Sequence, residues 1–294
     1  MKPAPFSYHA VSSVRAATAA LADAGDEAVV LAGGQSLLIE MSYRRVRPAV
    51  VVDINRVPEL GGLRADGAWV QVGALVRHRE LERADRAGPI GVDPLRMLLS
   101  QAARHVAHPP IRARGTFAGS IAWAHPAAEW CALAAALSAD IVLASASGSR
   151  SVPADQWFAG RHRTARNPDE LITEVRLPLL GAGTGVGFAE HRRTHGSFAL
   201  AAALAAVRVE GGRVAWARIG LANAAEVPVR ARGAEQVLAG QPLSAQLLGE
   251  AADAAAGAAN PAAEPHCSAE YRRHALRVLT RRCLAQATAE GAWR

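Results

Sequence analysis

The 294-residue sequence is poor in aromatic side chains, lysine and cysteine, and it has no long hydrophobic run. No apolar stretch approaches the roughly 18 residues of a membrane-spanning helix, and the N-terminal "MKPAPFSYHA" lacks the apolar centre of a secretory signal peptide. The three cysteines, Cys131, Cys267 and Cys283, are too far apart for the CxxC pairs of structural zinc or iron–sulfur sites. We therefore expect a cytoplasmic protein with no membrane span and no metal site.

Positive charge is abundant but dispersed. The formal net charge is +7 and the isoelectric point about 10.3, and Lys2 is the only lysine, so nearly all of this charge is arginine. Short clusters occur at residues 161–166 and 272–282, without interleaved aromatic residues. This pattern argues against nucleic-acid binding and favours an arginine-rich solvated surface, with an acidic protein as a possible partner.

Half of the residues are hydrophobic, which is enough for a large core divided among two or three domains. The first lobe, residues 1–57, reads as α/β. A helix is expected over 12–24 after a serine cap. It is followed by a buried strand in "AVVLAGG", a helix in "SLLIEMSYRR" and a second buried strand over 49–54.

Residues 58–177 are expected to form a second lobe. It contains strands at 69–76, "DIVLAS" and "ELITEVRLP", and helices at "RHRELERAD", "PLRMLLSQAARHVA" and 127–138. A glycine-rich stretch, "LLGAGTGVG", begins a third region over 178–294. There, two long strands joined at Gly211-Gly212 read as a hairpin, and three helices follow. Because His191 and His195 fall in a predicted strand region, we expect surface histidines rather than a metal pair.

The stretch "VVLAGGQSLLIEM" places two glycines between two apolar segments. A strand that ends in Gly-Gly and enters a helix through serine exposes unpaired backbone N–H groups and allows a ligand to approach closely. These groups and the serine hydroxyl can hold a phosphate. A tight turn with no ligand is the alternative, and this stretch alone does not decide between them.

A second stretch, "RGTFAGSIA", repeats the arrangement in the second lobe with Gly115, Thr116, Gly119 and Ser120. Two such turns in separate lobes indicate a ligand whose diphosphate lies between them. Neither turn matches the GxGxxG dinucleotide pattern, nor does "GAGTGVG", which leads into a strand. The sequence therefore does not predict a Rossmann domain.

Five segments occur in a fixed order over nearly the whole chain: "AGGQSLL", "VVDINRVPEL", "HPPIRARGTFAGSIA", "HPAAEW" and "SAEYRRHALRVLTRR". Together they resemble the FAD-binding medium subunit of the molybdenum hydroxylases, the relatives of carbon monoxide dehydrogenase and xanthine dehydrogenase. The resemblance implies an α+β fold. It consists of a two-lobed FAD-binding domain of the PCMH or vanillyl-alcohol-oxidase-like type, followed by a smaller sheet-and-helix C-terminal domain.

The resemblance also implies where FAD binds. The pyrophosphate is expected on the two glycine turns, and an apolar side chain, Leu171 or Ile172, is expected against the isoalloxazine ring. Leu37 begins the helix below the cofactor. The implied contacts are Ala32, Gly33, Gly34, Gln35, Ser36 and Leu37 in the first lobe, and Thr116, Phe117, Ala118, Gly119, Ser120, His125 and Leu171 in the second.

This chain departs from the family pattern at four of its residues. "TFAGS" stands where "TIGGS" is usual, so Phe117 and Ala118 are substituted and the Ala118 methyl group either crowds the phosphate or faces away. His125 stands in place of an aspartate that usually bonds the cofactor, and Ser197 stands at another acidic position. We expect any effect to fall on FAD affinity or redox behaviour rather than on the fold.

The implied activity is that of an oxidoreductase subunit without a catalytic acid, base or nucleophile. A large subunit with the molybdenum cofactor oxidises the substrate, and a small 2Fe–2S subunit passes electrons to the flavin, which delivers them to an external acceptor. The expected assembly is a dimer of heterotrimers. Two alternatives stay open: a flavoprotein that acts without molybdenum partners, and a scaffold that has lost its flavin.

Overall fold

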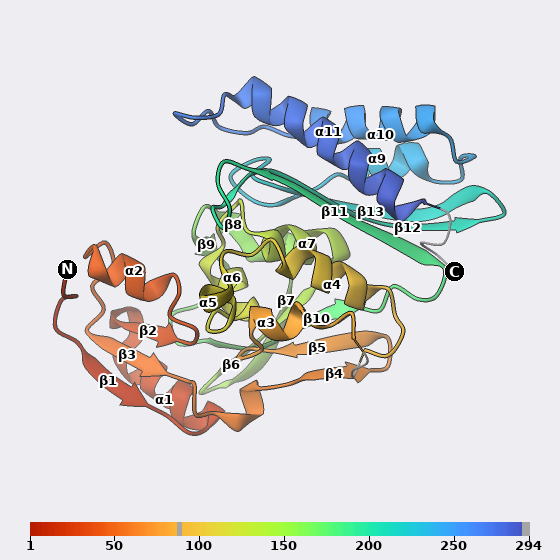
Figure 1. Ribbon diagram of the computed structural model, residues 1–294. Helices are drawn as coiled ribbons and strands as arrows, with labels where there is room; N and C mark the ends of the chain where they lie inside the picture. The colour runs from red at the N-terminus through yellow and green to blue at the C-terminus, as the bar shows by residue number, and fades with distance from the viewer. Residues whose placement is uncertain (87–89, 290–294) are drawn as a thin grey trace.

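The computed structural model describes residues 1–86 and 90–289 and contains three main sheets (Figure 1). The first is a parallel sheet in the order β1-β3-β2. The predicted serine cap of its first helix is confirmed, since Ser13 Oγ accepts a hydrogen bond from the Ala16 N–H at 3.2 Å. The elements of this lobe are β1 (Ser7–Ala10), α1 (Val14–Ala24), η1 (Gly25–Glu27), β2 (Ala28–Leu31), α2 (Leu37–Ser42), β3 (Val50–Asp53) and η2 (Pro58–Leu60).

The second sheet is antiparallel, in the order β4-β5-β10-β6-β7. Its strands are β4 (Leu63–Asp66), β5 (Trp69–Gly73), β6 (Asp140–Ser145), β7 (Gly148–Pro153) and β10 (Leu171–Pro178). The helices of this lobe are α3 (His78–Leu81), α4 (Leu95–Ala103), α5 (Pro109–Arg112), α6 (Phe117–Trp123), α7 (Glu129–Leu137) and α8 (Ala154–Trp157). A small ribbon, β8 (Phe158–Gly160) with β9 (Arg163–Thr164), completes it.

The third sheet, β11-β12-β13-β14, lies between α7 on one face and three helices on the other (Figure 1). Its strands are β11 (Thr184–Arg192), β12 (Ala199–Glu210), β13 (Arg213–Ala222) and β14 (Val229–Arg230), and its helices are α9 (Arg232–Leu238), α10 (Ala245–Gly257) and α11 (Ala269–Ala287). The predicted hairpin at Gly211-Gly212 is confirmed. None of the helices within the described ranges is long and apolar enough to span a membrane.

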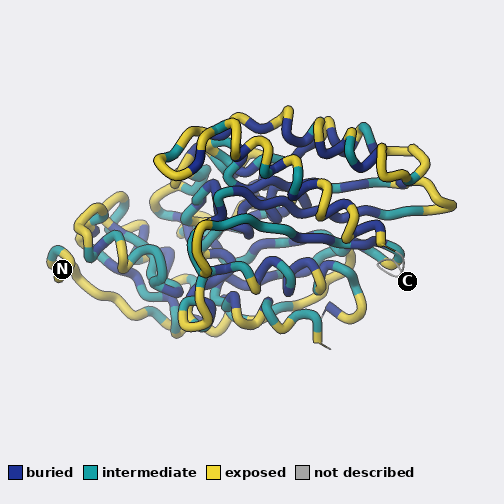
Figure 2. The backbone as a smooth tube through the Cα atoms, turned by 45° about the horizontal axis from the view of Figure 1, so that its top comes forward, coloured by how far each residue is buried: buried dark blue, intermediate teal, exposed yellow. Residues whose placement is uncertain are grey.

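Two hydrophobic cores meet at β12. Ala202, Leu204 and Ala206 face the core shared by the first two sheets and α7, whereas Ala203 and Ala205 face the core beneath α10 and α11. Successive side chains of a strand point to opposite faces, so a strand covered on both faces is apolar throughout. Figure 2 shows this double burial as dark strands through the middle of the molecule, while β1 is exposed along its length.

Two carboxyl groups are buried where α7 packs beneath the third sheet. The Glu190 side chain on β11 is fully buried, and neither of its carboxylate oxygens has a hydrogen-bond partner among the described residues. Arg192 Nη1 is 3.6 Å and His105 Nδ1 3.9 Å from Glu190 Oε1. Burial raises the pKa of Glu190 and of Glu129, and the charge of Glu129 raises that of Glu190 further. Burial, then the charges of Arg192 and His195, lower the pKa of His105 to about 4.

We expect Glu190→Gln to stabilise the protein, and more strongly at higher pH. The folded carboxyl groups keep their protons to a higher pH than the unfolded ones, so the unfolded state binds fewer protons and the free energy of unfolding falls as pH rises. The neutral amide of Gln removes this loss. The free energy of unfolding should therefore exceed that of the wild type by on the order of 1–3 kcal/mol near pH 8, and by less near pH 5. Urea denaturation at several pH values measures it, with the exposed Glu226→Gln as control. The explanation would be ruled out if the free energy of unfolding of Glu190→Gln changed with pH in parallel with that of the wild type.

Candidate functional site

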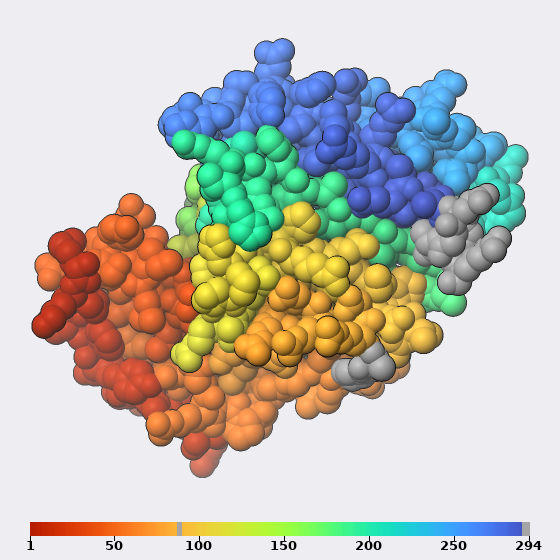
Figure 3. Space-filling view, in the orientation of Figure 1, coloured from red at the N-terminus to blue at the C-terminus, as the bar shows by residue number. Residues whose placement is uncertain are grey.

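A cavity of about 340 Å³ lies between the first lobe and the second. Its walls come from the loop after β2, the start of α2, the turn into α6, and the first residues of β10. In Figure 3 the red-to-orange surface of the first lobe and the yellow surface of the second meet along a furrow. The cavity therefore joins segments that are more than a hundred residues apart in the sequence.

The first glycine turn offers unused backbone donors. After β2 ends, Gly34 takes a positive φ of 72°, which glycine adopts at little cost. The main-chain N–H groups of Gly33, Gly34, Gln35 and Ser36 donate to no protein acceptor in the described parts of the chain. Gln35 instead uses its side chain, whose Nε2 donates to the Gly33 carbonyl at 3.2 Å. The turn can therefore hold an anionic group by its backbone.

The second turn resembles the first in sequence but uses its N–H groups differently. Phe117 N donates to the Val76 carbonyl at 3.0 Å, and Ser120 N donates to the Thr116 carbonyl at 3.2 Å. Gly119 N donates to Thr116 Oγ1, the side-chain cap of α6, at 3.0 Å. Most donors on this side are thus already engaged, and only the N–H groups of Thr116 and Ala118 donate to no acceptor among the described residues.

The two turns touch each other and are linked by a pair of polar side chains. Asn55 Nδ2 donates to the Ala32 carbonyl at 2.8 Å, and Asn55 Oδ1 accepts from Arg77 Nη2 at 2.7 Å. Arg77 Nη1 then donates to the Arg114 carbonyl, next to the second turn. Asp53 Oδ1 accepts from Asn55 Nδ2 at 2.6 Å and so orients the side-chain amide. We call Asn55 and Arg77 the Asn55–Arg77 clamp, since they connect the turns of the two lobes.

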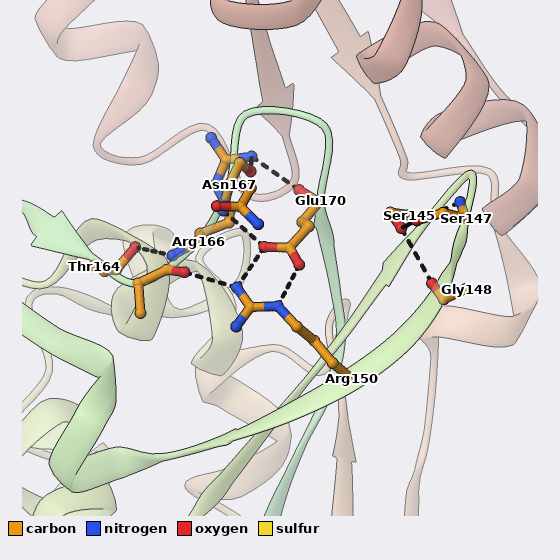
Figure 4. A network of polar contacts seen from close by, with 9 residues as sticks. Ser145, Ser147, Gly148, Arg150, Thr164, Arg166, Asn167 and Glu170 are labelled. Carbon is orange, nitrogen blue, oxygen red and sulfur yellow. Dashed lines mark hydrogen bonds and ion pairs between the residues drawn. The ribbon is translucent and has the colours of Figure 1, made fainter.

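An ion-pair network holds the strand that forms the apolar wall (Figure 4). Glu170 accepts hydrogen bonds from Arg150 Nη2 at 2.8 Å and from Asn167 N at 2.7 Å, and Arg166 Nη1 donates to the Glu170 carbonyl at 2.8 Å. Burial works to raise the pKa of Glu170, but the bonds from Arg150 and Asn167 outweigh it and lower the pKa. The network fixes the backbone just before Leu171, whose side chain lines the cavity.

Most residues that the sequence singled out border this one cavity. They are Ala32, Gly33, Gly34, Gln35, Ser36, Leu37, Thr116, Ala118, Gly119, Ser120 and Leu171, together with Ile172. The lining also contains residues that the sequence did not single out as contacts: His78, Arg166, Ile54, Ala74 and Ala122 among them.

Phe117 and His125 are not part of the lining. Phe117 is fully buried and packs edge-on against Trp130, with ring centroids 5.0 Å apart, so it belongs to the core. His125 stacks on exposed Phe198 at 4.0 Å, and its Nδ1 accepts a hydrogen bond from Ala127 N. Burial, then the charge of Arg161, lower its pKa to about 4. Ala118 does border the cavity and is 3% exposed.

Family models match almost the whole chain. Residues 4–180 match the FAD binding domain in molybdopterin dehydrogenase, and residues 187–287 match the CO dehydrogenase flavoprotein C-terminal domain. The chain belongs to the FAD-binding medium subunits of the molybdenum hydroxylase family. It is therefore an oxidoreductase subunit whose cofactor is FAD, and the resemblance inferred from the five ordered segments is confirmed.

Relatives of this medium subunit are similar over their full length. The 6-hydroxypseudooxynicotine dehydrogenase complex subunit alpha of Paenarthrobacter nicotinovorans is 38% identical, covering 98% of this chain and 96% of the relative. The carbon monoxide dehydrogenase medium chain of Hydrogenophaga pseudoflava is 37% identical, covering 98% and 99%.

Solved structures agree with this fold. A chain of the Hydrogenophaga pseudoflava carbon monoxide dehydrogenase that lacks the Mo-pyranopterin moiety superposes with a TM-score of 0.93 at 38% identity, covering 98% of this chain and 99% of that one. Quinoline 2-oxidoreductase from Pseudomonas putida 86 gives 0.91 at 33% identity over the full length of both chains.

The cavity of the medium subunit has the features that FAD requires. The free N–H groups of the first turn suit a diphosphate. The apolar residues Leu171, Ile172 and Trp123 suit a flat aromatic ring. Arg166 and Glu170 bring charge to the lining, and both are tied into the network of Figure 4.

Proposed function

We propose that this chain is the electron-transfer subunit of a three-chain molybdenum-containing hydroxylase or dehydrogenase. In this proposal it works in the cytoplasm with a large molybdenum-cofactor subunit and a small 2Fe–2S subunit, in a dimer of heterotrimers. Electrons pass from the iron–sulfur clusters to the FAD of this chain and then to an external acceptor. End-to-end similarity to subunits of named dehydrogenase complexes supports the assembly, and three buried free cysteines fit a reducing compartment.

The character of the cavity is the observation on which the proposal chiefly rests. Its lining consists mainly of backbone donors, small residues and apolar side chains. Its charged members, Arg166 and Glu170, are tied into the ion-pair network with Arg150 and Asn167. Such a lining binds and orients a cofactor rather than attacking a substrate. The bound FAD supplies the redox chemistry, since flavins accept and release electrons.

Individual residues have definite tasks in this proposal. The N–H groups of Gly33 to Ser36 hold the diphosphate, and the Asn55–Arg77 clamp keeps the opposite turn at the distance that a single diphosphate can bridge. Leu171 and Ile172 pack against the ring system and exclude water from it. The residue set Leu37, Thr116, Ala118, Gly119 and Ser120 completes the enclosure.

Purification with and without partners tests the proposal. We expect the chain to bind FAD, with an absorbance band at about 450 nm, and to be captured by tagged large and small subunits co-expressed with it. Reduction of the small subunit under anaerobic conditions should then bleach the flavin band of the complex. A yellow protein that binds neither partner would instead support a flavoprotein that acts alone. A colourless protein that assembles with both partners would support a scaffold that has lost its flavin.

A further inference from the structure

His78 is a buried histidine in the wall of the cavity. It is the first residue of α3, it is 4% exposed, and it lines the cavity beside the second glycine turn. Its main-chain N–H donates to the Gly115 carbonyl at 3.1 Å. The ring edge that carries Nε2 packs on Gly115 so closely that a Cβ there would lie 2.7 Å from Nε2. The position of the ring is thus fixed relative to the turn.

The opposite side of the ring fixes its tautomer. Trp130 Nε1–H donates to His78 Nδ1 at 3.0 Å, in the buried core. A ring nitrogen that accepts a hydrogen bond carries no proton, so the neutral imidazole has its proton on Nε2. Burial, then the charges of Arg112 and Arg77, lower the pKa of His78 to about 3, and the ring therefore stays neutral across the physiological range.

The proton on Nε2 has no protein acceptor. Among residues 1–86 and 90–289, His78 engages only Nδ1 of its ring in a hydrogen bond. Nε2 is not sealed in the core, since the described buried atoms that lack a partner do not include it. A donor that opens into a cavity normally finds its partner in water or a ligand. On this side of the cavity the N–H groups of Phe117, Gly119 and Ser120 are already engaged. Only the N–H groups of Thr116 and Ala118 are left without an acceptor among the described residues of this turn, so a side-chain donor would add to them, and His78 is placed to supply one.

We propose that His78 is a cofactor-contact residue, whose neutral Nε2–H donates to a diphosphate oxygen of FAD beside Gly115, with Trp130 fixing the tautomer. The inference rests on the proposed placement of the diphosphate between the two glycine turns. It adds an imidazole donor on the side of the second lobe, where fewer main-chain N–H groups are left without an acceptor than at the first turn.

The test measures affinities of the apoprotein for three probes. FAD and ADP contain a diphosphate, whereas riboflavin has the ring system without it. We expect His78→Leu to lower the affinities for FAD and ADP by about 10- to 100-fold and to leave the affinity for riboflavin unchanged. His78→Gln, which keeps an N–H close to the Nε2 position, should stay within about threefold of the wild type. The exposed His266→Leu is the matched control.

A second measurement does not depend on binding. Nitrogen-15 NMR of the apoprotein should show His78 as the Nε2–H tautomer at neutral pH, and Trp130→Phe should give a mixture of tautomers and weaker ADP binding. The role of His78 would be overturned if His78→Leu bound FAD and ADP as tightly as the wild type does. A proton found on Nδ1 of His78 would overturn it as well. Should His78→Leu fail to fold, His78→Gln and Trp130→Phe still decide. A wild type that binds neither FAD nor ADP would instead refute the proposed function.

Discussion

Gly33→Ala is expected to abolish FAD binding while leaving each lobe folded. A Cβ at Gly33 would lie 2.4 Å from the Arg114 carbonyl oxygen and 2.7 Å from the Gly115 Cα. Both are backbone atoms of the opposite turn, so no side chain can rotate to make room. The two turns must separate instead, and the diphosphate can then be held by only one of them. A hydrogen bond to a charged group contributes about 1.5–3 kcal/mol, so losing the donors of one turn should lower the affinity for FAD at least 100-fold.

Titration of apoprotein with FAD, followed by quenching of flavin fluorescence, measures this loss, and circular dichroism checks the fold. Gly249→Ala is the matched control, because a Cβ at this position in α10 meets nothing within 4 Å. It should bind FAD as the wild type does. Wild-type affinity in Gly33→Ala would mean that the contact between the turns is not needed to hold the cofactor.

The first glycine turn could be predicted from the sequence, because its properties are local. Two glycines after an apolar strand already imply a tight turn with exposed N–H groups, and the structure has this turn. The second turn looked equivalent in sequence, but the Thr116 hydroxyl occupies the Gly119 N–H. Whether a threonine caps a helix or faces a ligand depends on backbone angles that the motif does not specify.

Residues whose surroundings come from distant parts of the chain were not predictable. His78 depends on Trp130, 52 residues away, and the Asn55–Arg77 clamp joins two lobes. Phe117 sat inside the motif, yet its side chain enters the core against Trp130. The periodicity of the sequence does not indicate which distant residues come into contact.

The secondary structure also divides into elements with local causes, which could be predicted, and elements that depend on distant residues, which could not. The buried strand β12 was predicted because burial on both faces leaves a continuous apolar run. The exposed strands β1 and β7 were not predicted, since an edge strand with mostly solvated side chains has no apolar pattern to detect. Tertiary pairing, rather than local preference, forms them.

Arg77→Met is expected to weaken FAD binding by about 100-fold, since it removes a charge-assisted bridge and leaves two acceptors unpaired. The guanidinium connects Asn55 Oδ1 to the Arg114 carbonyl, and Asn55 in turn holds the Ala32 carbonyl of the first turn. Methionine keeps most of the side-chain volume, so packing changes little. Arg77→Lys, with a single ammonium group in place of the fork, should give an intermediate loss.

A double-mutant cycle separates the clamp from two independent effects. Because Asn55 and Arg77 act in series between the turns, Asn55→Ala should cost nearly as much as Arg77→Met, and the double variant little more than either. Arg79→Met, at an exposed position in the helix that follows Arg77, is the control and should bind FAD normally. Additive losses would show that the two residues do not form one link. The same cycle run on ADP should reproduce the coupling, since the turns grip the diphosphate, whereas riboflavin should show little of it.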